Sequence, residues 1–383
     1  MDFLLSEEQQ MIVKTTRDFV VNELYPYEAE IEETGHLRPE LRDEIKRKAI
    51  EAGLYAANMP AEAGGAGLDT LTWVLYEKEL GRANYALHWN CVARPSNILM
   101  ACVGEQREKY LFPAVAGKMV DCLAMTEPGV GSDVRGMKCF AKQDGDDFIV
   151  NGTKHFISHA DEATFTILFA ATGEEDTPRG KKKLITAFLV DKGTPGFAAT
   201  TSLSKSGLRT IPMGGFELTD CAVPESSRLG AEGIGLSMFN HTLEWERSFI
   251  LASHVGAMAR QLDEAVAYAK TRQQFGRPIG AFQSVSNRLA DMKVRLETAR
   301  LLLYKLAWMK HEAQPAALES AIAKLHVSEC FLDSSIDAVR TFGGKGYLAE
   351  AGVERDLRDA LGGVIYAGTS DIQRNLIARL LGL

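Results

Sequence analysis

The sequence has no cysteine pattern that would bind a metal cluster. Its six cysteines are separated from one another by at least 11 positions, and none forms a Cys-x-x-Cys pair. Zinc and iron–sulfur sites need closely spaced thiolates, so we expect no metal centre of that kind. The same spacing favours reduced, buried thiols in a cytoplasmic protein.

Long apolar runs and a basic leader are also missing. No stretch reaches the roughly 18 uncharged apolar residues that cross a bilayer, and even residues 301–309 are interrupted by Lys305. Near the start, Glu7 and Glu8 stand where a signal peptide would be positively charged and then apolar. We therefore expect neither a membrane span nor export by such a signal.

An excess of positive charge is absent as well. The 43 Lys and Arg residues are outnumbered by 51 Asp and Glu residues, which gives a net charge of −8. Binding to a nucleic-acid backbone depends on a basic surface, so we expect no nucleic-acid partner. With 46% hydrophobic and 25% charged residues, the 383-residue chain has a globular composition and the length for two or three domains.

Residue patterns divide the chain into three parts. From Ser6, a typical helix N-cap, to about residue 117, apolar residues recur every three or four positions. From 122 to about 227, short runs of β-branched and aromatic residues alternate with turns, and from 233 onward the helical spacing returns. The clearest predicted helices cover residues 39–52, 69–81, 105–115, 243–270, 284–310 and 315–342. The predicted strands lie at 148–150, 156–157, 164–170, 184–190 and 215–218.

Five short motifs follow one another along the chain. Residues 125–133 read Met-Thr-Glu-Pro-Gly-Val-Gly-Ser-Asp, and hydroxyls beside glycines suit a loop that wraps a polar ring or a phosphate, although the same text is also typical of a plain turn. Residues 151–158 (Asn-Gly-Thr-Lys-His-Phe-Ile-Ser) and 271–279 (Thr-Arg-Gln-Gln-Phe-Gly-Arg-Pro-Ile) come next. Residues 342–347 (Phe-Gly-Gly-Lys-Gly-Tyr) and 368–370 (Gly-Thr-Ser) complete the set.

This ordered set resembles the acyl-CoA dehydrogenase family over essentially the whole chain. The resemblance implies an α+β fold that is mainly α, with an N-terminal helical domain (1–120), a middle β-sheet or barrel domain (121–230) and a C-terminal four-helix bundle (231–383). It also implies a homotetramer with one FAD per subunit. The implied reaction is oxidation of an acyl-CoA thioester to the 2,3-enoyl-CoA, with electrons passed to an electron-transfer flavoprotein.

The resemblance also assigns cofactor contacts. Met125 and Thr126 would contact the edge of the flavin ring, Ser132 would lie where flavin and CoA phosphate meet, and Phe156 and Ser158 would flank the isoalloxazine. Residues from a neighbouring subunit would reach the pyrophosphate and adenosine of FAD, namely Arg272, Gln283, Arg340, Gly343 and Gly344. Thr369 would close over the cofactor, and Phe275 and Asp371 complete the predicted cofactor contacts.

Several positions depart from the family pattern. Phe156 stands where Trp is common, and Arg340 stands where Gln is common, although a guanidinium can pair well with phosphate oxygens. Asp371 replaces a longer polar residue and suits a phosphate-bearing cofactor poorly. Most importantly, residues 366–369 read Tyr-Ala-Gly-Thr, where many relatives have Tyr-Glu-Gly-Thr and use that Glu as the catalytic base.

Since Ala367 cannot accept a proton, the base must lie elsewhere. A minority of relatives, including isovaleryl-CoA and long-chain enzymes, carry it in a Glu-Arg pair on a C-terminal helix, and Glu246 with Arg247 matches that pair. Glu244 and Glu246 are roughly 200° apart around a helix, so only one of them can face the flavin. The resemblance selects Glu246, which would take the α-proton while flavin N5 receives a hydride from the β-carbon.

The remaining substrate contacts follow from the same resemblance. The backbone N–H of Ala367 would still hold the thioester carbonyl, and the missing Glu side chain leaves room for a branched, cyclic or bulky acyl group. Arg247 would point toward CoA, and Arg94 would either read a polar group on the acyl chain or lie at a surface or interface. The full set of predicted substrate contacts is Ser132, Glu244, Arg247, Tyr366 and Gly368.

Other functions stay open at this point. The same scaffold suits a flavin oxidase or oxygenase that reacts with O2, or an enzyme that runs in the enoyl-CoA reductase direction. A non-catalytic flavin-bound binding protein is favoured by Ala367 but opposed by Glu246 and by the negative net charge. The sequence identifies neither the acyl chain nor the electron acceptor.

Overall fold

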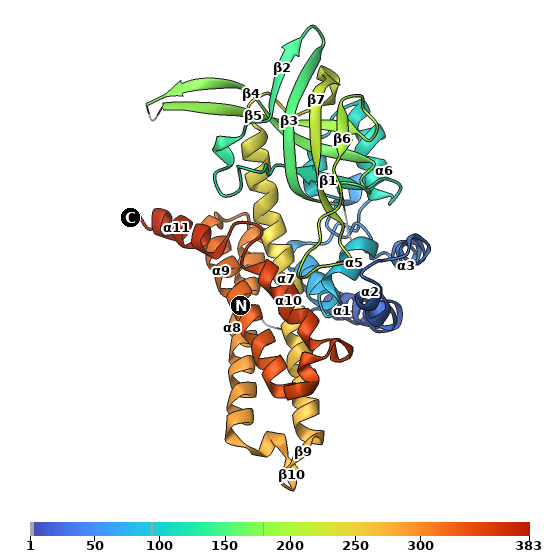
Figure 1. Ribbon diagram of the computed structural model, residues 1–383, viewed down its shortest axis with the longest axis vertical. Coiled ribbons are helices and arrows are strands. Elements are labelled where there is room, and N and C mark those ends of the chain that lie inside the picture. The colour runs from blue at the N-terminus through green and yellow to red at the C-terminus, as the bar shows by residue number, and fades with distance from the viewer. Residues whose placement is uncertain (1–3, 93–94, 179) are drawn as a thin grey trace.

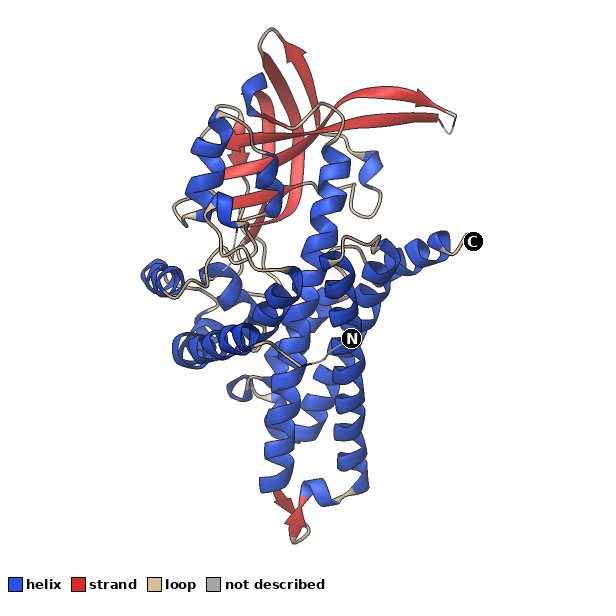
Figure 2. Ribbon diagram, turned by 180° about the vertical axis from the view of Figure 1, so that it is seen from behind, coloured by secondary structure: helices blue, strands red, loops and turns tan. Residues whose placement is uncertain are grey.

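The computed structural model describes residues 4–92, 95–178 and 180–383. The chain folds into three structural parts (Figure 1). Helices come first, a curled sheet lies at one end of the molecule, and a long helical bundle extends to the other end (Figure 2). The predicted α+β, mainly α fold is therefore confirmed. Among the described residues, no helix is long and apolar enough to cross a membrane.

The N-terminal part is built from short helices with clear caps. Ser6 accepts a hydrogen bond from the Gln9 N–H while Gln9 Oε1 accepts one from the Ser6 N–H, which is the capping box expected there. Asp69 accepts from the Leu71 and Thr72 N–H groups at the start of the helix predicted over 69–81. The helices are α1 (Glu7–Phe19), α2 (Glu28–Thr34), α3 (Pro39–Glu51), α4 (Thr70–Leu80), α5 (Tyr85–Cys91) and α6 (Phe112–Val115). The predicted helix over 105–115 is present, and its middle is a π-helical turn (Arg107–Leu111) that runs into α6.

The middle part is one sheet whose strand order is β6-β7-β3-β2-β4-β5-β8, with β1 parallel to β4. The strands are β1 (Asp121–Ala124), β2 (Phe140–Asp144), β3 (Asp147–Ser158), β4 (Phe165–Thr177), β5 (Gly180–Asp191), β6 (Phe197–Ala199), β7 (Met213–Pro224) and β8 (Arg228–Leu229). The predicted strands at 148–150 and 156–157 are both part of β3. The far ends of β4 and β5 project from the body as an arm, along which acidic residues of β4 lie opposite lysines of β5 (Figure 1).

The C-terminal part is a bundle built on one very long helix. Apolar residues of α7 (Gly235–Thr271), α8 (Gln283–His311), α9 (Ala317–Phe342) and α10 (Val353–Gly363) share one core. A small hairpin of β9 (Gln273–Gln274) and β10 (Arg277–Pro278) joins α7 to α8 at the tip, and α11 (Ser370–Leu380) ends the chain. Because α7 runs from the sheet to this tip, one helix packs against the sheet at its start and forms part of the bundle along the rest of its length (Figure 1).

Candidate active site

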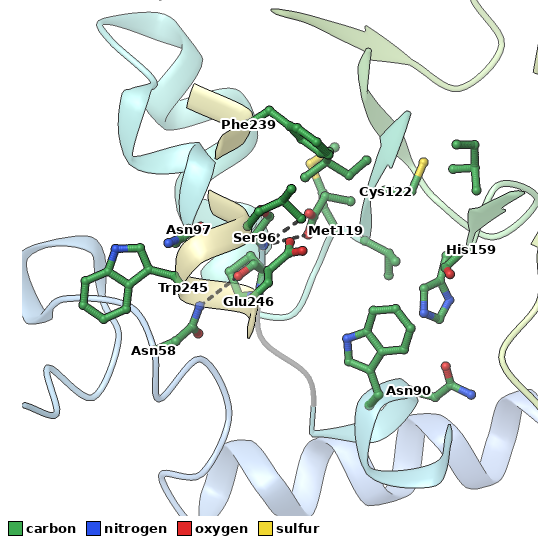
Figure 3. A pocket seen from close by; sticks show the side chains of 18 of the residues that line it. Asn58, Asn90, Ser96, Asn97, Met119, Cys122, His159, Phe239, Trp245 and Glu246 are labelled. Atoms are coloured by element: carbon green, nitrogen blue, oxygen red, sulfur yellow. Dashed lines mark hydrogen bonds between the residues drawn. The ribbon is translucent and has the colours of Figure 1, made fainter. Parts of the chain in front are cut away.

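A cavity of about 540 Å³ lies where the three parts meet. Its walls come from α3, α4 and α5, from β1 and β3, and from the first turns of α7 (Figure 3). Residues from two of the five motifs and from α7 meet around it. The predicted site residues that line it are Met125, Thr126, Phe156, Ser158 and Glu246.

Glu244 and Glu246, both on α7, have separate surroundings. Glu246 lines the cavity, and Figure 3 shows its carboxylate directed into it. Glu244 Oε1 instead accepts a hydrogen bond from Lys310 Nζ of α8 at 2.8 Å, and this ammonium group also lies 4.6 Å from the centre of the Trp245 ring. Burial lowers the pKa of Lys310, while Glu244 acts to raise it. Glu244 is thus turned toward α8, as its rotation around the helix requires, and is not among the residues that line the cavity.

Phe156 is displayed at an irregular point of β3. The pairing of β3 with β7 shifts register between His155 and Ile157, so Phe156 lies at a bulge. Its φ of +57° is unusual for an aromatic residue, and its side chain remains 58% exposed. Such strain is typical of functional positions, and here it turns an aromatic ring outward beside the cavity.

A buried ion pair holds the first two motifs together. Lys154 Nζ donates to Glu127 Oε1 and to the Met125 carbonyl, each at 3.0 Å, and both charged side chains are almost fully buried. The His155 N–H also donates to the Thr126 carbonyl at 2.9 Å. The sequence reasoning missed this pair, although an acid and a lysine inside two matched motifs are a usable signal. Its effect is to fix the loop that presents Thr126.

The loop that precedes α11 has a constrained backbone. Ala367 has a φ of +52°, and its N–H donates to no atom of the described residues. Its carbonyl accepts a hydrogen bond from Arg247 Nε at 3.0 Å. Tyr366 points into the bundle, where its hydroxyl lies 2.9 Å from His254 Nε2 and burial raises its pKa well above the usual range. Arg247 and Tyr366 therefore contact the protein itself.

The predicted residues of the bundle tip lie far from the cavity. Arg272 follows Glu246 by 272 − 246 = 26 residues along α7 and the turn that ends it, which at 1.5 Å per residue is roughly 39 Å. Phe275 in the adjoining hairpin is 92% exposed, and Gln283 is exposed as well. Within a single chain these residues and Thr126 cannot contact the same part of one cofactor.

The other predicted cofactor residues lie at exposed turns. Arg340 pairs with Asp337 at 3.6 Å but stays largely exposed. At the end of α9, a Cβ added to Gly343 or Gly344 would meet no atom within 4 Å, so the backbone borders open space. Ser132 is exposed.

Thr369 and Asp371 belong to the start of α11. The Thr369 hydroxyl accepts a hydrogen bond from the Ile372 N–H at 3.2 Å and so caps the helix. Asp371 is exposed and pairs with Arg374 at 3.3 Å. Its carboxylate is therefore already engaged by a basic partner within its own helix.

Comparison with known proteins agrees with this architecture. Three models match almost the whole chain: the acyl-CoA dehydrogenase N-terminal domain (residues 6–118), middle domain (122–221) and C-terminal domain (233–382). The chain belongs to the acyl-CoA dehydrogenase family. The predicted family and enzyme class are thus confirmed.

Individual members of the family match end to end. A probable acyl-CoA dehydrogenase, YngJ, from Bacillus subtilis (strain 168) is 36% identical, with all of both chains covered. An L-prolyl-[peptidyl-carrier protein] dehydrogenase from Serratia sp. (strain ATCC 39006) is also 36% identical, covering 100% of this chain and 99% of the relative. The solved FAD complex of PigA superposes with a TM-score of 0.92 at 35% identity, with both chains fully covered.

The N-terminal helices supply much of the cavity wall that sequence reasoning missed. Asn58, Trp89 and Asn90 line it, as do Arg42 and Lys46 on α3. These side chains come from scattered helices, and only tertiary packing brings them to one place, so no local pattern marks them. Arg94, which the sequence suggested as a reader of polar acyl groups, lies outside the described residues.

Proposed function

We propose that this chain is an FAD-dependent dehydrogenase that converts an acyl-CoA thioester into its 2,3-enoyl product. The observation that carries the proposal is the place of Glu246, whose carboxylate points into the cavity that Thr126, Phe156 and Ser158 also line. In the proposed reaction, Glu246 removes the α-proton of the acyl group and the β-carbon loses a hydride.

The residues present suit FAD. Thr126 and Ser158 offer hydroxyls and Phe156 offers an exposed ring beside the cavity, while the open backbone at Gly343 and Gly344 leaves space for a phosphate-bearing group. When bound, FAD supplies the acceptor for the hydride. The solved PigA relative binds FAD in the same fold.

The thioester carbonyl of the substrate needs a hydrogen-bond donor when the α-proton is removed, because negative charge then develops on its oxygen. The Ala367 N–H donates to no described residue and is therefore available for the thioester oxygen. A fixed N–H of this kind stabilises the negative charge that develops on that oxygen. Glu246 and Ala367 thus act as base and hydrogen-bond donor from two different elements.

The distance between the two ends of α7 supports an assembly of several copies. Arg272, Phe275 and Gln283 can take part in a cofactor site only if the bundle tip of a second copy reaches the cavity side of the first. We therefore include the homotetramer in the proposal, with these residues and Arg340 contributed across an interface. The six unpaired, buried cysteines support a cytoplasmic location.

The cavity wall favours a compact acyl group with polar features. Trp73 and Trp89 provide flat walls for a ring or branch, while Asn58, Asn90 and Lys46 offer polar contacts that a long alkyl chain would leave unused. Ala367 is not among the residues that line the cavity, and we propose that its short side chain leaves room near the reacting carbons. We propose a branched, cyclic or otherwise bulky acyl group.

A second candidate substrate is a thioester attached to a carrier protein. It is favoured by the 36% identical relative from Serratia, which is named for dehydrogenation of a prolyl group on a peptidyl-carrier protein. That acyl group is cyclic and polar, as the cavity wall also favours. The chemistry at Glu246 is the same in both cases, so only the group that carries the thioester, CoA or a carrier protein, differs.

Anaerobic titration of the flavoprotein with acyl thioesters tests the proposal. We expect bleaching of the flavin absorbance with branched or cyclic acyl-CoAs, and a loss of at least about 10³-fold in bleaching rate for Glu246→Gln. Glu244→Gln is the matched control on the same helix and should retain the rate. Bleaching that survives Glu246→Gln but not Glu244→Gln contradicts the base assignment.

The same sample identifies the electron acceptor and the scaffold. After reduction, slow reoxidation in air together with fast reoxidation by an electron-transfer flavoprotein supports a dehydrogenase, whereas fast reoxidation in air supports the oxidase alternative. Comparing one acyl group on CoA and on a carrier protein, by kcat/KM, decides between the two substrates. No bleaching with any thioester would favour the non-catalytic alternative.

A further inference from the structure

The side chain of Arg247 is hydrogen-bonded to the backbone of the loop that precedes α11. It follows Glu246 directly on α7, and its Nε donates to the Ala367 carbonyl at 3.0 Å. Burial lowers the pKa of Arg247, and no carboxylate lies within ion-pair distance of it among the described residues. Its guanidinium is therefore a half-buried cation whose hydrogen-bond partner is a peptide carbonyl.

Gln373 of α11 also contacts this loop. This fully buried side chain of α11 donates through Nε2 to the Gly368 carbonyl at 3.0 Å and toward the Ala367 carbonyl at 3.4 Å. A Cβ at Gly368 would lie 2.6 Å from that Nε2 and 3.6 Å from Nη2 of Arg247. The loop is thus closely enclosed by the two donors.

The two donors determine where the Ala367 N–H points. The N–H and the carbonyl of a residue are related through its φ and ψ, so contacts that hold the carbonyl and the backbone torsions of Ala367, whose φ is +52°, also hold the direction of its N–H. A left-handed conformation at an alanine costs about 1–2 kcal/mol and persists only where surrounding contacts hold it. Arg247 and Gln373 provide those contacts.

We propose that Arg247 and Gln373 are positioning residues that hold the Ala367 N–H in place for the thioester oxygen. Because Arg247 is adjacent to Glu246, one turn of α7 sets both the base and the hydrogen-bond donor. This inference rests on the proposed function, in which Glu246 removes the α-proton. It replaces the expectation that Arg247 contacts CoA.

A ligand that stops after deprotonation tests the inference without turnover. In a 3-thiaacyl-CoA, sulfur replaces the β-carbon, so no hydride can leave, and the enolate formed against oxidised flavin gives a long-wavelength charge-transfer band. Titrating that band with pH gives the pKa of the bound α-proton. We expect Arg247→Gln to raise this pKa by about one unit, a tenfold weaker stabilisation of the enolate, and Gln373→Met to raise it in the same direction.

Three comparisons separate this role from others. Arg260→Gln removes another half-buried guanidinium of α7, one that pairs with Glu28 away from the loop, and should lower stability without moving the ligand pKa. Arg247→Lys should restore part of the wild-type value because it keeps a donor. If Glu246→Gln leaves the band intact, the proposed function fails, whatever Arg247 does.

Truncating the thioester separates positioning from phosphate binding. A positioning role predicts that Arg247→Gln lowers kcat about equally for a CoA thioester and for its pantetheine analogue, with KM little changed. A rise in KM confined to the CoA thioester, with an unchanged α-proton pKa in both Arg247→Gln and Gln373→Met, overturns the inference in favour of a CoA contact. If Arg247→Gln does not fold, Gln373→Met decides alone by the same pKa.

Discussion

Arg247 Nε donates to the Ala367 carbonyl at 3.0 Å, so the residue that follows the proposed base is bonded to the residue that offers the free N–H. Arg247 and Ala367 lie 120 positions apart in the chain, and this one contact joins the element of the base to the loop of the donor. A small change in the loop should therefore alter catalysis without altering substrate binding in proportion.

Gly368→Ala tests whether a change in the loop alters catalysis more than substrate binding. Gly368 has a φ of +90°, and the added Cβ would lie 2.6 Å from Gln373 Nε2, so both strain and a clash would displace the loop. We expect kcat to fall at least about tenfold with a smaller change in KM. Gly145→Ala is the control, since Gly145 has a φ of +61° but open space around it, and it should cost about 1 kcal/mol of stability with kcat unchanged. Equal kcat losses in both variants would contradict this account.

The buried pair of Lys154 and Glu127 should be essential for stability. Lys154→Met leaves the Glu127 carboxylate buried without its cation, which typically costs about 3–5 kcal/mol. Denaturant unfolding should show this loss, and Lys154→Met with Glu127→Gln should recover part of it. The exposed Lys14–Asp18 pair is the contrast, and Lys14→Met should change the unfolding free energy by less than about 1 kcal/mol. A small effect of Lys154→Met would show that the loop is held by other contacts.

Local sequence signals predicted the elements better than the site. The residues around Asp69 and the apolar spacing of α7 are local signals, and they predicted helices over 69–81 and 243–270. The bounds of α4 agree with the first prediction to within one residue, whereas α7 begins eight residues before the second, at Gly235. The motif segments around Thr126 and Phe156 were expected at the cofactor, and both residues line the cavity. In contrast, the hydrogen bond between Arg247 and Ala367 joins residues far apart in the chain, and the turn of Glu244 toward Lys310 depends on how α8 packs. Such contacts are properties of tertiary packing.

Asp359 should make stability depend on pH. Burial raises the pKa of Asp359 to about 7, above the value of about 3.9 in an unfolded chain. The folded protein therefore binds a proton that the unfolded chain has lost, so this residue's contribution to stability is complete below about pH 4 and declines as pH rises toward 7. Asp359→Asn keeps an acceptor for the Leu208 N–H and should abolish that decline. Urea unfolding of both proteins at pH 5 and pH 7.5 measures it, and parallel changes would contradict the assigned direction.

Moving the carboxylate from residue 246 to residue 367 tests whether the catalytic base can occupy either position. Glu246→Gln removes the proposed base, and Ala367→Glu in that background restores a carboxylate at the position that many family members use. Because the backbone of residue 367 is already held by Arg247 and Gln373, the new side chain should enter the vacated volume beside the reacting carbons. We expect the double variant to bleach flavin at least about tenfold faster than Glu246→Gln with a short straight acyl-CoA. It should remain poor with branched or cyclic groups, since the added side chain occupies their space. Glu246→Gln with Ala367→Gln supplies the same volume without a base and should stay inactive, so recovery in that control would place the base at neither residue.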